Sequence, residues 1–440
     1  MLDWNKLLAN TRIRESKRPH DARSAFESDF GRIIFSPAVR RMHDKTQVFP
    51  LTTDDNIHSR LTHSLEVMSV GYSLAIRFCD SEKMQKRIGW KSDALFRAIS
   101  VILKNACLIH DIGNPPFGHF GESVIQEYFK GLFEENPQLF NLTEAQKRDF
   151  VHFDGNAQGL RVLTKLQNMG DSFGMNLTYA TLAACMKYPN ADAIDKSHIE
   201  TKKVGVFQSE KEVFNKIAAA CGLETEGMVV RHPLCYLVEA ADSICYLTMD
   251  LEDGFNKNLF TLEELKCAIG EAFPVINEFL KNDDSDLAKI SKIRNALIGH
   301  LVDMAFQNFE NNIDKIENGE YNQELIFADP PLAKQLQKFC IEKIFSIEEI
   351  YTLEMTGHSV LKGLLDFFID CIFRRSNEYR RRAVKLISSN MKQVAVQEMQ
   401  VDDFEELTDY YKLRVIVDFV VGMTDKYALV FYQKISGERI

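Results

Sequence analysis

Hydrophobic residues recur at helical spacing over residues 93–111. Their positions follow an i, i+3, i+4 rhythm, which is the pattern of a helix with one apolar face. Asp93 is a residue type typical of a helix N-cap, and Gly113 lies just past the last periodic position. The pattern predicts an amphipathic helix, and its apolar side holds Leu95, Phe96, Ile99, Ile102, Leu103, Ala106 and Ile109.

Two further stretches show the same helical spacing. Residues 59–79 predict a helix, and one side of it holds Leu61, Leu65, Met68 and Tyr72. Residues 233–251 predict another helix, which opens with Pro233, a residue favoured in the first helical turn. These helices carry the side chains on which the functional interpretation depends.

Strand signals along the chain are few and short. Residues 427–432 fit a strand or a helix equally well. Residues 281–286 and 311–323 are polar and are expected to be solvent-exposed connections, and neither is typical of a domain boundary. We therefore predict an all-α protein with little β structure. Its core region should span residues 1–255, with a helical C-terminal extension over residues 256–440 packed against it as one body.

Length and composition describe an ordinary globular protein. The chain has 440 residues, of which 45% are hydrophobic and 26% are charged. This length suits two or three domains and a large core. No run of about eighteen apolar residues occurs, so no membrane span is predicted. The N-terminus lacks the apolar stretch of a secretory signal, and a cytoplasmic location is expected.

Charge and cysteine usage argue against two classes of function. The net charge of −10 argues against a broad nucleic-acid-binding surface, which needs an excess of Lys and Arg, although a local basic pocket could still bind an anionic substrate. The nine cysteines contain no CxxC pair. Most, such as Cys107, Cys185 and Cys245, lie in apolar helical patterns, and we expect them to be reduced core residues without a redox or zinc role.

The segment 110–122 is the most informative part of the chain. It places two potential metal ligands, His110 and Asp111, side by side at the end of a predicted helix. Adjacent side chains on a straight helix point about 100° apart. Gly113 and the prolines at 115–116 end the helix just after the two ligands, which frees the backbone to bring them together. The segment is therefore a candidate reaction centre.

A metal site needs further ligands from other helices. His63 lies on the helix predicted over 59–79, and Asp242 is an acid inside the apolar helix predicted over 233–251. An unpaired buried charge is costly, and a bound cation is one way to compensate it. With His110 and Asp111 these residues form a set suited to Mn, Fe, Co, Ni, Zn or Mg. The alternative is that each is a hydrogen-bonded structural residue.

His119 and Glu122 follow three residues apart. If the chain resumes a helix there, the two side chains lie within reach of each other. An imidazole titrates near neutral pH and can transfer a proton, and a carboxylate beside it would orient the ring. The alternative for Glu122 is a first-turn carboxylate that faces the helix dipole.

Two strings of sequence closely resemble a known family. RLTHSLEV at 60–67 and HDIGNPPFGHFGE at 110–122 are similar to segments of the bacterial deoxyguanosine triphosphate triphosphohydrolases of the HD-domain superfamily. The resemblance covers nearly the whole chain, and it implies the helical HD-domain fold. Shorter similar segments occur in the same order at 44–50, 153–158, 187–189 and 422–425.

The resemblance assigns roles to individual residues. It implies that the metal ligands are His63, His110, Asp111 and Asp242, and that His119 and Glu122 are the catalytic pair. Eukaryotic relatives carry a second catalytic histidine where this chain has Asn114, which places the chain with the bacterial branch. The residues expected to contact the substrate are Gln47, Arg60, Asn114, Asn156, Gln158, Lys187, Tyr246 and Asp250.

The implied activity is metal-dependent hydrolysis of a deoxynucleoside triphosphate, with dGTP preferred, to a deoxynucleoside and tripolyphosphate. His119 fits two roles equally, as acid toward the 5′ oxygen or as base toward the attacking water. The resemblance also implies a homo-oligomer, a tetramer or hexamer, with a dNTP or single-stranded DNA as a candidate allosteric effector and no membrane partner. Alternatives are an HD phosphohydrolase for another nucleotide, or a regulatory protein that responds to nucleotides or single-stranded DNA.

Overall fold

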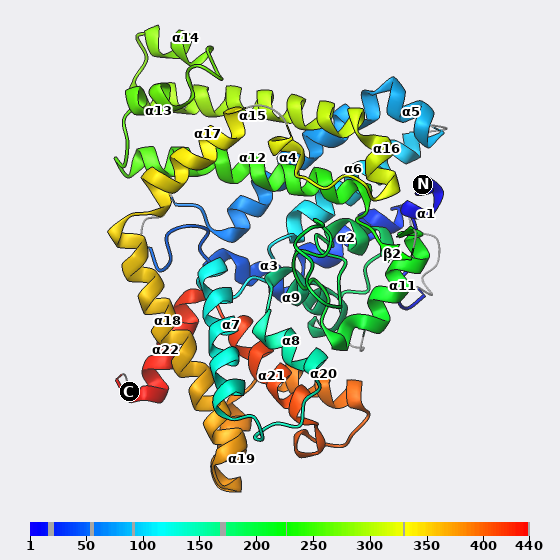
Figure 1. Cartoon of the computed structure of the whole chain (residues 1–440), viewed down its shortest axis with the longest axis vertical. Helices are drawn as coiled ribbons and strands as arrows, with labels where there is room; N and C mark the ends of the chain where they lie inside the picture. The colour runs from blue at the N-terminus through cyan, green and yellow to red at the C-terminus, as the bar shows by residue number, and fades with distance from the viewer. Residues whose placement is uncertain are drawn as a thin grey trace.

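Helices make up almost all of the regular structure. The computed structural model describes residues 1–15, 22–52, 57–89, 93–167, 173–225, 227–328 and 331–438. Within these ranges the only strands are β1 (Glu224–Thr225) and β2 (Met228–Val229), which form one antiparallel pair. The prediction of an all-α protein with little β structure is confirmed (Figure 1).

The first hydrophobic core lies in the upper half of Figure 1. It is built around four helices that pack against one another, α4 (Arg60–Asp80), α6 (Asp93–Ile109), α12 (Pro233–Asn256) and α15 (Asp286–Asn311). The helices that complete it are α1 (Trp4–Leu7), α2 (Ala25–Ile34), α3 (Pro37–Arg41), α5 (Glu82–Ile88), α10 (Tyr179–Cys185), α11 (Lys211–Cys221), α13 (Leu262–Ile269), α14 (Ile276–Lys281), α16 (Ile313–Asn318) and α17 (Pro331–Cys340).

The second core lies below it and joins distant parts of the sequence. Its buried side chains come from residues 117–207 and from residues 360–428. C-terminal helices therefore pack directly against the N-terminal half, while the division at residue 255 stays a prediction. The helices that contribute are α7 (Gly118–Glu135), α8 (Glu144–Val151), α9 (Gly155–Arg161), α18 (Glu348–Ile369), α19 (Asn377–Leu386), α20 (Ser389–Met399), α21 (Asp409–Val421) and α22 (Asp425–Ser436). Short 3₁₀ or π-helical segments occupy Met42–Asp44, Val162–Leu166, Gln208–Glu210, Leu325–Phe327, Ile341–Phe345, Asp370–Arg374 and Phe404–Glu406.

The three helices predicted from periodicity are confirmed as α4, α6 and α12. Ser59 caps α4 by accepting a hydrogen bond from the backbone N–H of Thr62. α6 ends at Ile109, so the next residues form a turn, as the following glycine and prolines predict. The ambiguous segment 427–432 is helical, within α22. The segment 311–323 is not a simple exposed connection, because it contains α16, which buries Ile313 and Ile316. No helix among the described residues is long and apolar enough to cross a membrane.

The side of α4 that holds Leu61, Leu65, Met68 and Tyr72 is only partly buried, since Leu61 and Met68 are half-buried and pack against the first core. Leu65 and Tyr72 are exposed, and Val67, Leu74 and Phe78 are buried instead. The buried face also contains Gly71, where an added Cβ would lie 2.4 Å from the sulfur of Cys107 on α6. The absence of a side chain at this position lets α4 approach α6 closely.

The cysteines occupy the places expected of core residues. All nine are free thiols, and Cys107 and Cys245 are fully buried while Cys185 is half-buried. Cys267 is exposed.

Replacing Gly71 by alanine should destabilise the fold. The new methyl group would collide with Cys107, and overpacking of this kind costs about 1–3 kcal/mol of unfolding free energy. Gly299→Ala is the matched control, because an added Cβ in that part of α15 meets nothing within 4 Å. It should be neutral or stabilising by up to about 1 kcal/mol. Urea denaturation of both variants tests this, and equal stabilities would contradict it.

Candidate functional site

Side chains from three separate helical segments converge at one point. His63 lies on α4, His110 follows the end of α6, and Asp242 lies on α12. Nε2 of His63 is 3.1 Å and Nε2 of His110 is 3.3 Å from the same oxygen, Oδ1 of Asp242. The ligand atoms of all three residues lie within 4.8 Å of one another, and no other group of three such residues occurs within the described ranges.

The chemistry of these donors fits a divalent cation. Nδ1 of His110 lies 2.7 Å from the carbonyl oxygen of Cys107, to which it donates its proton, so the lone pair of Nε2 points toward the other ligands. Nε2 is buried, and its approach to Asp242 does not have the geometry of a hydrogen bond, so it has no such partner among the described residues. Although burial opposes protonation, Asp111 and Asp242 raise the pKa of His110 to about 9. The two carboxylates thus create a negative field that favours a positive charge at this point.

Asp111 lies beside the three residues and not among them. Its Oδ1 is 3.6 Å from Nε2 of His110, while its Oδ2 forms an ion pair with Arg60. Burial would raise the pKa of Asp111, but Arg60 and His110 lower it to about 2, so the carboxylate is charged. Nδ2 of Asn114 donates to Oδ1 over 2.7 Å. Three of the four predicted ligands therefore meet, and the fourth is adjacent and held by Arg60 and Asn114.

His119 lies in the first turn of α7, and Glu122 begins the second turn. Nδ1 of His119 lies 3.0 Å from Oε2 of Glu122, and Oε1 of Glu122 accepts a hydrogen bond from the N–H of Gly155 over 2.7 Å. The hydrogen bond that His119 donates to Glu122 raises the pKa of His119 above its ordinary value. The His119 side chain is 78% exposed and lines the cavity described next, so Nε2 is the ring atom available to a ligand.

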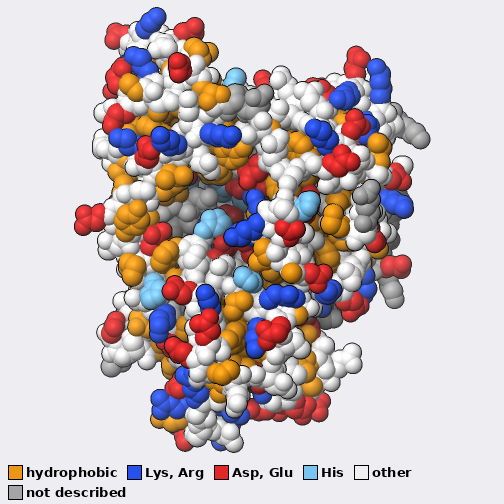
Figure 2. Space-filling view, viewed as in Figure 1, with side chains coloured by type: hydrophobic (Ala, Val, Ile, Leu, Met, Phe, Trp, Pro, Cys, Tyr) orange, Lys and Arg blue, Asp and Glu red, His pale blue; other side chains and the backbone are white. Residues whose placement is uncertain are grey.

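A cavity of about 430 Å³ is lined by Asp242 and the adjacent Asp111 and by His119. Figure 2 shows a hollow between the upper and lower helices, with histidine, lysine and acidic side chains around it. Burial, followed by the nearby Asp253, raises the pKa of Asp250 well above its usual range. The cavity contains five of the residues predicted to contact the substrate, which are Gln47, Arg60, Lys187, Tyr246 and Asp250.

Cationic side chains gather beside this cavity around Tyr188. Nζ of Lys187 is 3.1 Å from Oε1 of Glu239, and the buried Arg231 contacts the other oxygen of Glu239 at 3.0 Å. Although burial opposes the charge, Glu239 raises the pKa of Lys187 well above its ordinary value. Lys202 and Lys203 each lie 5.7 Å from the ring centre of Tyr188. The site therefore holds a fixed positive charge at neutral pH.

Three residues predicted to contact the substrate do not line the cavity. Asn114 orients Asp111, as described above, and Asn156 donates two hydrogen bonds to Asp154 at the start of α9. Gln158 is fully buried in the second core, where its amide pairs with Asp418 and Arg414. Because both ends of the Gln158 amide are bonded within the protein, the expected substrate contact does not fit its placement.

The sequence interpretation missed the acids and apolar residues that close the cavity. Glu324 precedes the 3₁₀ segment Leu325–Phe327, and Ile350 and Glu354 lie one turn apart on α18. No local motif marks them. An acid one turn from an apolar residue on an amphipathic helix is a weak signal, since it is typical of any helix at a surface.

Known proteins are similar to this chain over nearly all of its length. A family model described as phosphohydrolase-associated domain matches residues 331–434. A deoxyguanosinetriphosphate triphosphohydrolase-like protein of Listeria innocua is 35% identical over 99% of this chain and 100% of its own length. One of Pseudomonas aeruginosa is 34% identical over 99% of both. The deoxyguanosinetriphosphate triphosphohydrolase of Yersinia enterocolitica is 30% identical over 94% of both. The similarity thus spans both cores.

Asp242→Asn should abolish tight binding of a divalent cation. The substitution removes the charge that both histidines face, while the shape of the side chain is kept. Asp250→Asn is the matched control, because it lies two turns further along α12 and outside the three converging residues. Titration calorimetry with Mn²⁺ on metal-free protein measures the difference. Equal affinity in the wild type and Asp242→Asn would exclude this metal site.

Proposed function

The chain belongs to the deoxyguanosinetriphosphate triphosphohydrolase family, and we propose that it hydrolyses dGTP to deoxyguanosine and tripolyphosphate with the help of a divalent metal ion. One observation carries this proposal. Asp242, one of the three converging residues, and the adjacent Asp111 line the same cavity as His119 of the His119–Glu122 pair. A cation site and a proton-transfer group on either side of one cavity are what cleavage of a phosphate ester requires.

His63, His110 and Asp242 would hold the ion, with Asp111 adjacent. The donor set suits Mn, Fe, Co, Ni or Zn, and also Mg. When bound, such an ion supplies Lewis-acid stabilisation of the negative charge that develops on the α-phosphate. Asn114 and Arg60 fix the orientation of Asp111 at this end of the cavity.

His119 would act as the acid. In the reaction a water oxygen bonds to the α-phosphorus and gives up a proton to the solvent, while the bond from phosphorus to the 5′ oxygen breaks. An alkoxide is a poor leaving group, so a proton must reach that oxygen. Because Glu122 accepts the Nδ1 proton and raises the pKa of the ring, His119 is supported as the protonated partner that donates from Nε2.

Other residues of the cavity match the remaining parts of the nucleotide. Arg60 and Lys187 supply positive charge for the triphosphate. Oε1 of Gln47 is buried without a hydrogen-bond partner among the described residues, and it lines the cavity as an acceptor for a sugar hydroxyl. The carboxylate of Glu354 is an acceptor for the N–H groups of guanine, which supports the preference for dGTP.

The experiment that tests the function is a product assay. The four dNTPs are supplied singly and in pairs with Mn²⁺, Mg²⁺, Fe²⁺, Co²⁺, Ni²⁺ or Zn²⁺, and phosphorus NMR identifies the products. We expect tripolyphosphate as the phosphorus-containing product and the fastest turnover with dGTP. If a second dNTP activates the protein, turnover of one dNTP will rise when another is added.

The matched variants separate chemistry from folding. His119→Ala should lower kcat at least about 100-fold, because a positioned proton donor usually accelerates a reaction by at least this factor. His43→Ala should leave kcat unchanged, because His43 is exposed, pairs with Asp44 and does not line the cavity. Release of orthophosphate or pyrophosphate, or full activity in His119→Ala, would contradict the proposal.

The pH dependence tests the role of His119. Glu122→Gln removes the charge that raises the pKa of His119, so the imidazole loses its proton at lower pH than in the wild type. If His119 is the acid, the alkaline limb of kcat/KM follows this pKa and moves to lower pH. Profiles of both proteins at saturating metal measure the shift. Movement of the acidic limb alone would instead assign His119 as the base.

A further inference from the structure

The backbone just before His119 adopts an unusual conformation. Phe117 and Gly118 both have positive φ, 62° and 58°. For an aromatic residue this conformation costs about 1–3 kcal/mol and persists only where the surroundings hold it. Since Gly118 is the first residue of α7, the strained Phe117 sets how the chain enters the helix that carries His119 and Glu122.

The backbone of Phe117 is held by a residue from the far end of the sequence. Its N–H donates to Oδ1 of Asp425 over 3.1 Å. Oδ2 of Asp425 accepts two further hydrogen bonds from Thr46, one from the backbone N–H at 3.0 Å and one from Oγ1 at 2.5 Å. Asp425 is the first residue of α22 and is buried. One carboxylate therefore ties α7 to the segment that carries the cavity residue Gln47.

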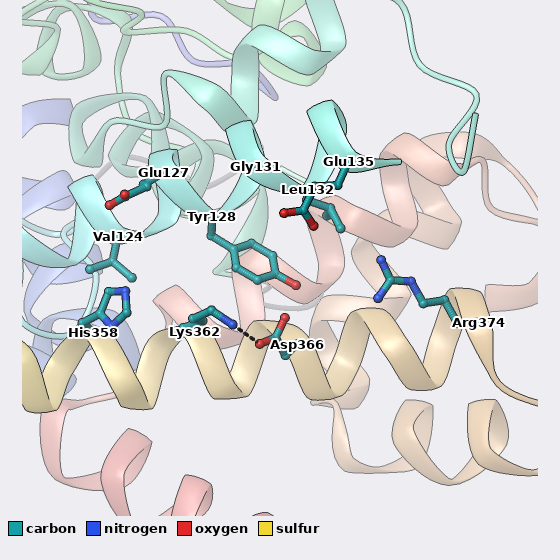
Figure 3. Close-up of a pocket in the computed structure, with 10 residues that line it drawn as sticks. All are labelled: Val124, Glu127, Tyr128, Gly131, Leu132, Glu135, His358, Lys362, Asp366 and Arg374. Carbon is teal, nitrogen blue, oxygen red and sulfur yellow. Dashed lines mark hydrogen bonds and ion pairs between the residues drawn. The ribbon is translucent and has the colours of Figure 1, made fainter. Parts of the chain in front are cut away.

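The ring of Phe117 is held by the C-terminal region as well. It packs against Gly357 of α18, where an added Cβ would lie 2.6 Å from the ring. Beyond this contact α7 and α18 continue side by side, and Tyr128 of α7 faces Lys362 and Asp366 of α18 (Figure 3). The strained residue is thus fixed through both its N–H and its side chain.

A buried lysine fixes the other end of the same loop. Nζ of Lys45 donates to the carbonyl oxygen of Asn114 over 2.6 Å and to that of Val421 over 2.9 Å. Val421 ends α21, four residues before Asp425. The loop 114–117 is therefore attached at both ends to the short connection between α21 and α22.

We propose that Asp425 is a positioning residue for the catalytic pair, and that the C-terminal region completes the active site by holding the loop 114–117. The inference rests on the proposed function only for the effect on turnover. It assigns to residues 421–425 the placement of His119, although no hydrogen bond or ion pair among the described residues joins that segment to His119.

The test uses Asp425→Asn in the whole protein. An asparagine has the same shape but one acceptor oxygen, so either Phe117 or Thr46 loses its partner. We expect kcat to fall about 10- to 100-fold, as for a small misplacement of a catalytic group. We also expect faster amide hydrogen exchange over residues 114–121, and a lower imidazole pKa for His119 by NMR. Gly357→Ala should produce the same changes, because the added methyl group would collide with the ring of Phe117.

Asp409→Asn is the matched control. Asp409 also lies in the C-terminal region and accepts a long-range backbone hydrogen bond, from Asn141 at 2.8 Å, but does not line the cavity. We expect Asp409→Asn to match the wild type in amide hydrogen exchange over residues 114–121, in the pKa of His119 and in kcat. Wild-type values of all three in Asp425→Asn would overturn the proposal. If the wild type hydrolyses no dNTP, the proposed function fails, and exchange and the His119 pKa still decide whether Asp425 positions the loop.

Discussion

The close contact of α4, α6 and α12 at Gly71 is the constraint on which the candidate metal site depends. An added Cβ there would lie 2.4 Å from Sγ of Cys107 on α6 and 3.9 Å from Cβ of Ala241 on α12. Ala241 precedes Asp242, and the carbonyl of Cys107 orients His110. A larger side chain at this crossing would separate the helices, and ligands from different helices meet only if the helices stay within contact distance.

The charges around the cavity are arranged in fixed pairs. Arg60 is held by Asp111, and Lys187 is held by Glu239. Burying such groups is costly unless each has a partner, and the fully buried Arg231 supplies a second partner for Glu239. The cations thus face the cavity in defined positions before any substrate arrives, so little reorganisation is needed when a phosphate binds.

Much of the helical framework and the converging ligands could be predicted from the sequence, because those signals are local. His110 at the end of a periodic stretch and Asp242 inside an apolar one both stand out without knowledge of the fold. The buried face of α4 could not be predicted in this way, since hydrophobic spacing gives no weight to Gly71, whose lack of a side chain lets α4 approach α6 closely. The burial of Gln158 in the second core could not be predicted either, because its partners Asp418 and Arg414 lie more than 250 residues away in the chain.

The second core has a consequence for the order in which the protein matures during synthesis. The three converging ligands are all present once α12 has left the ribosome, and the helices that carry them pack against one another. The partners of Phe117 on α18 and α22 emerge much later. Because N-terminal parts of a chain fold first during translation, His63, His110 and Asp242 can come together early in a nascent chain, whereas Phe117 gains its partners only when the last helices dock.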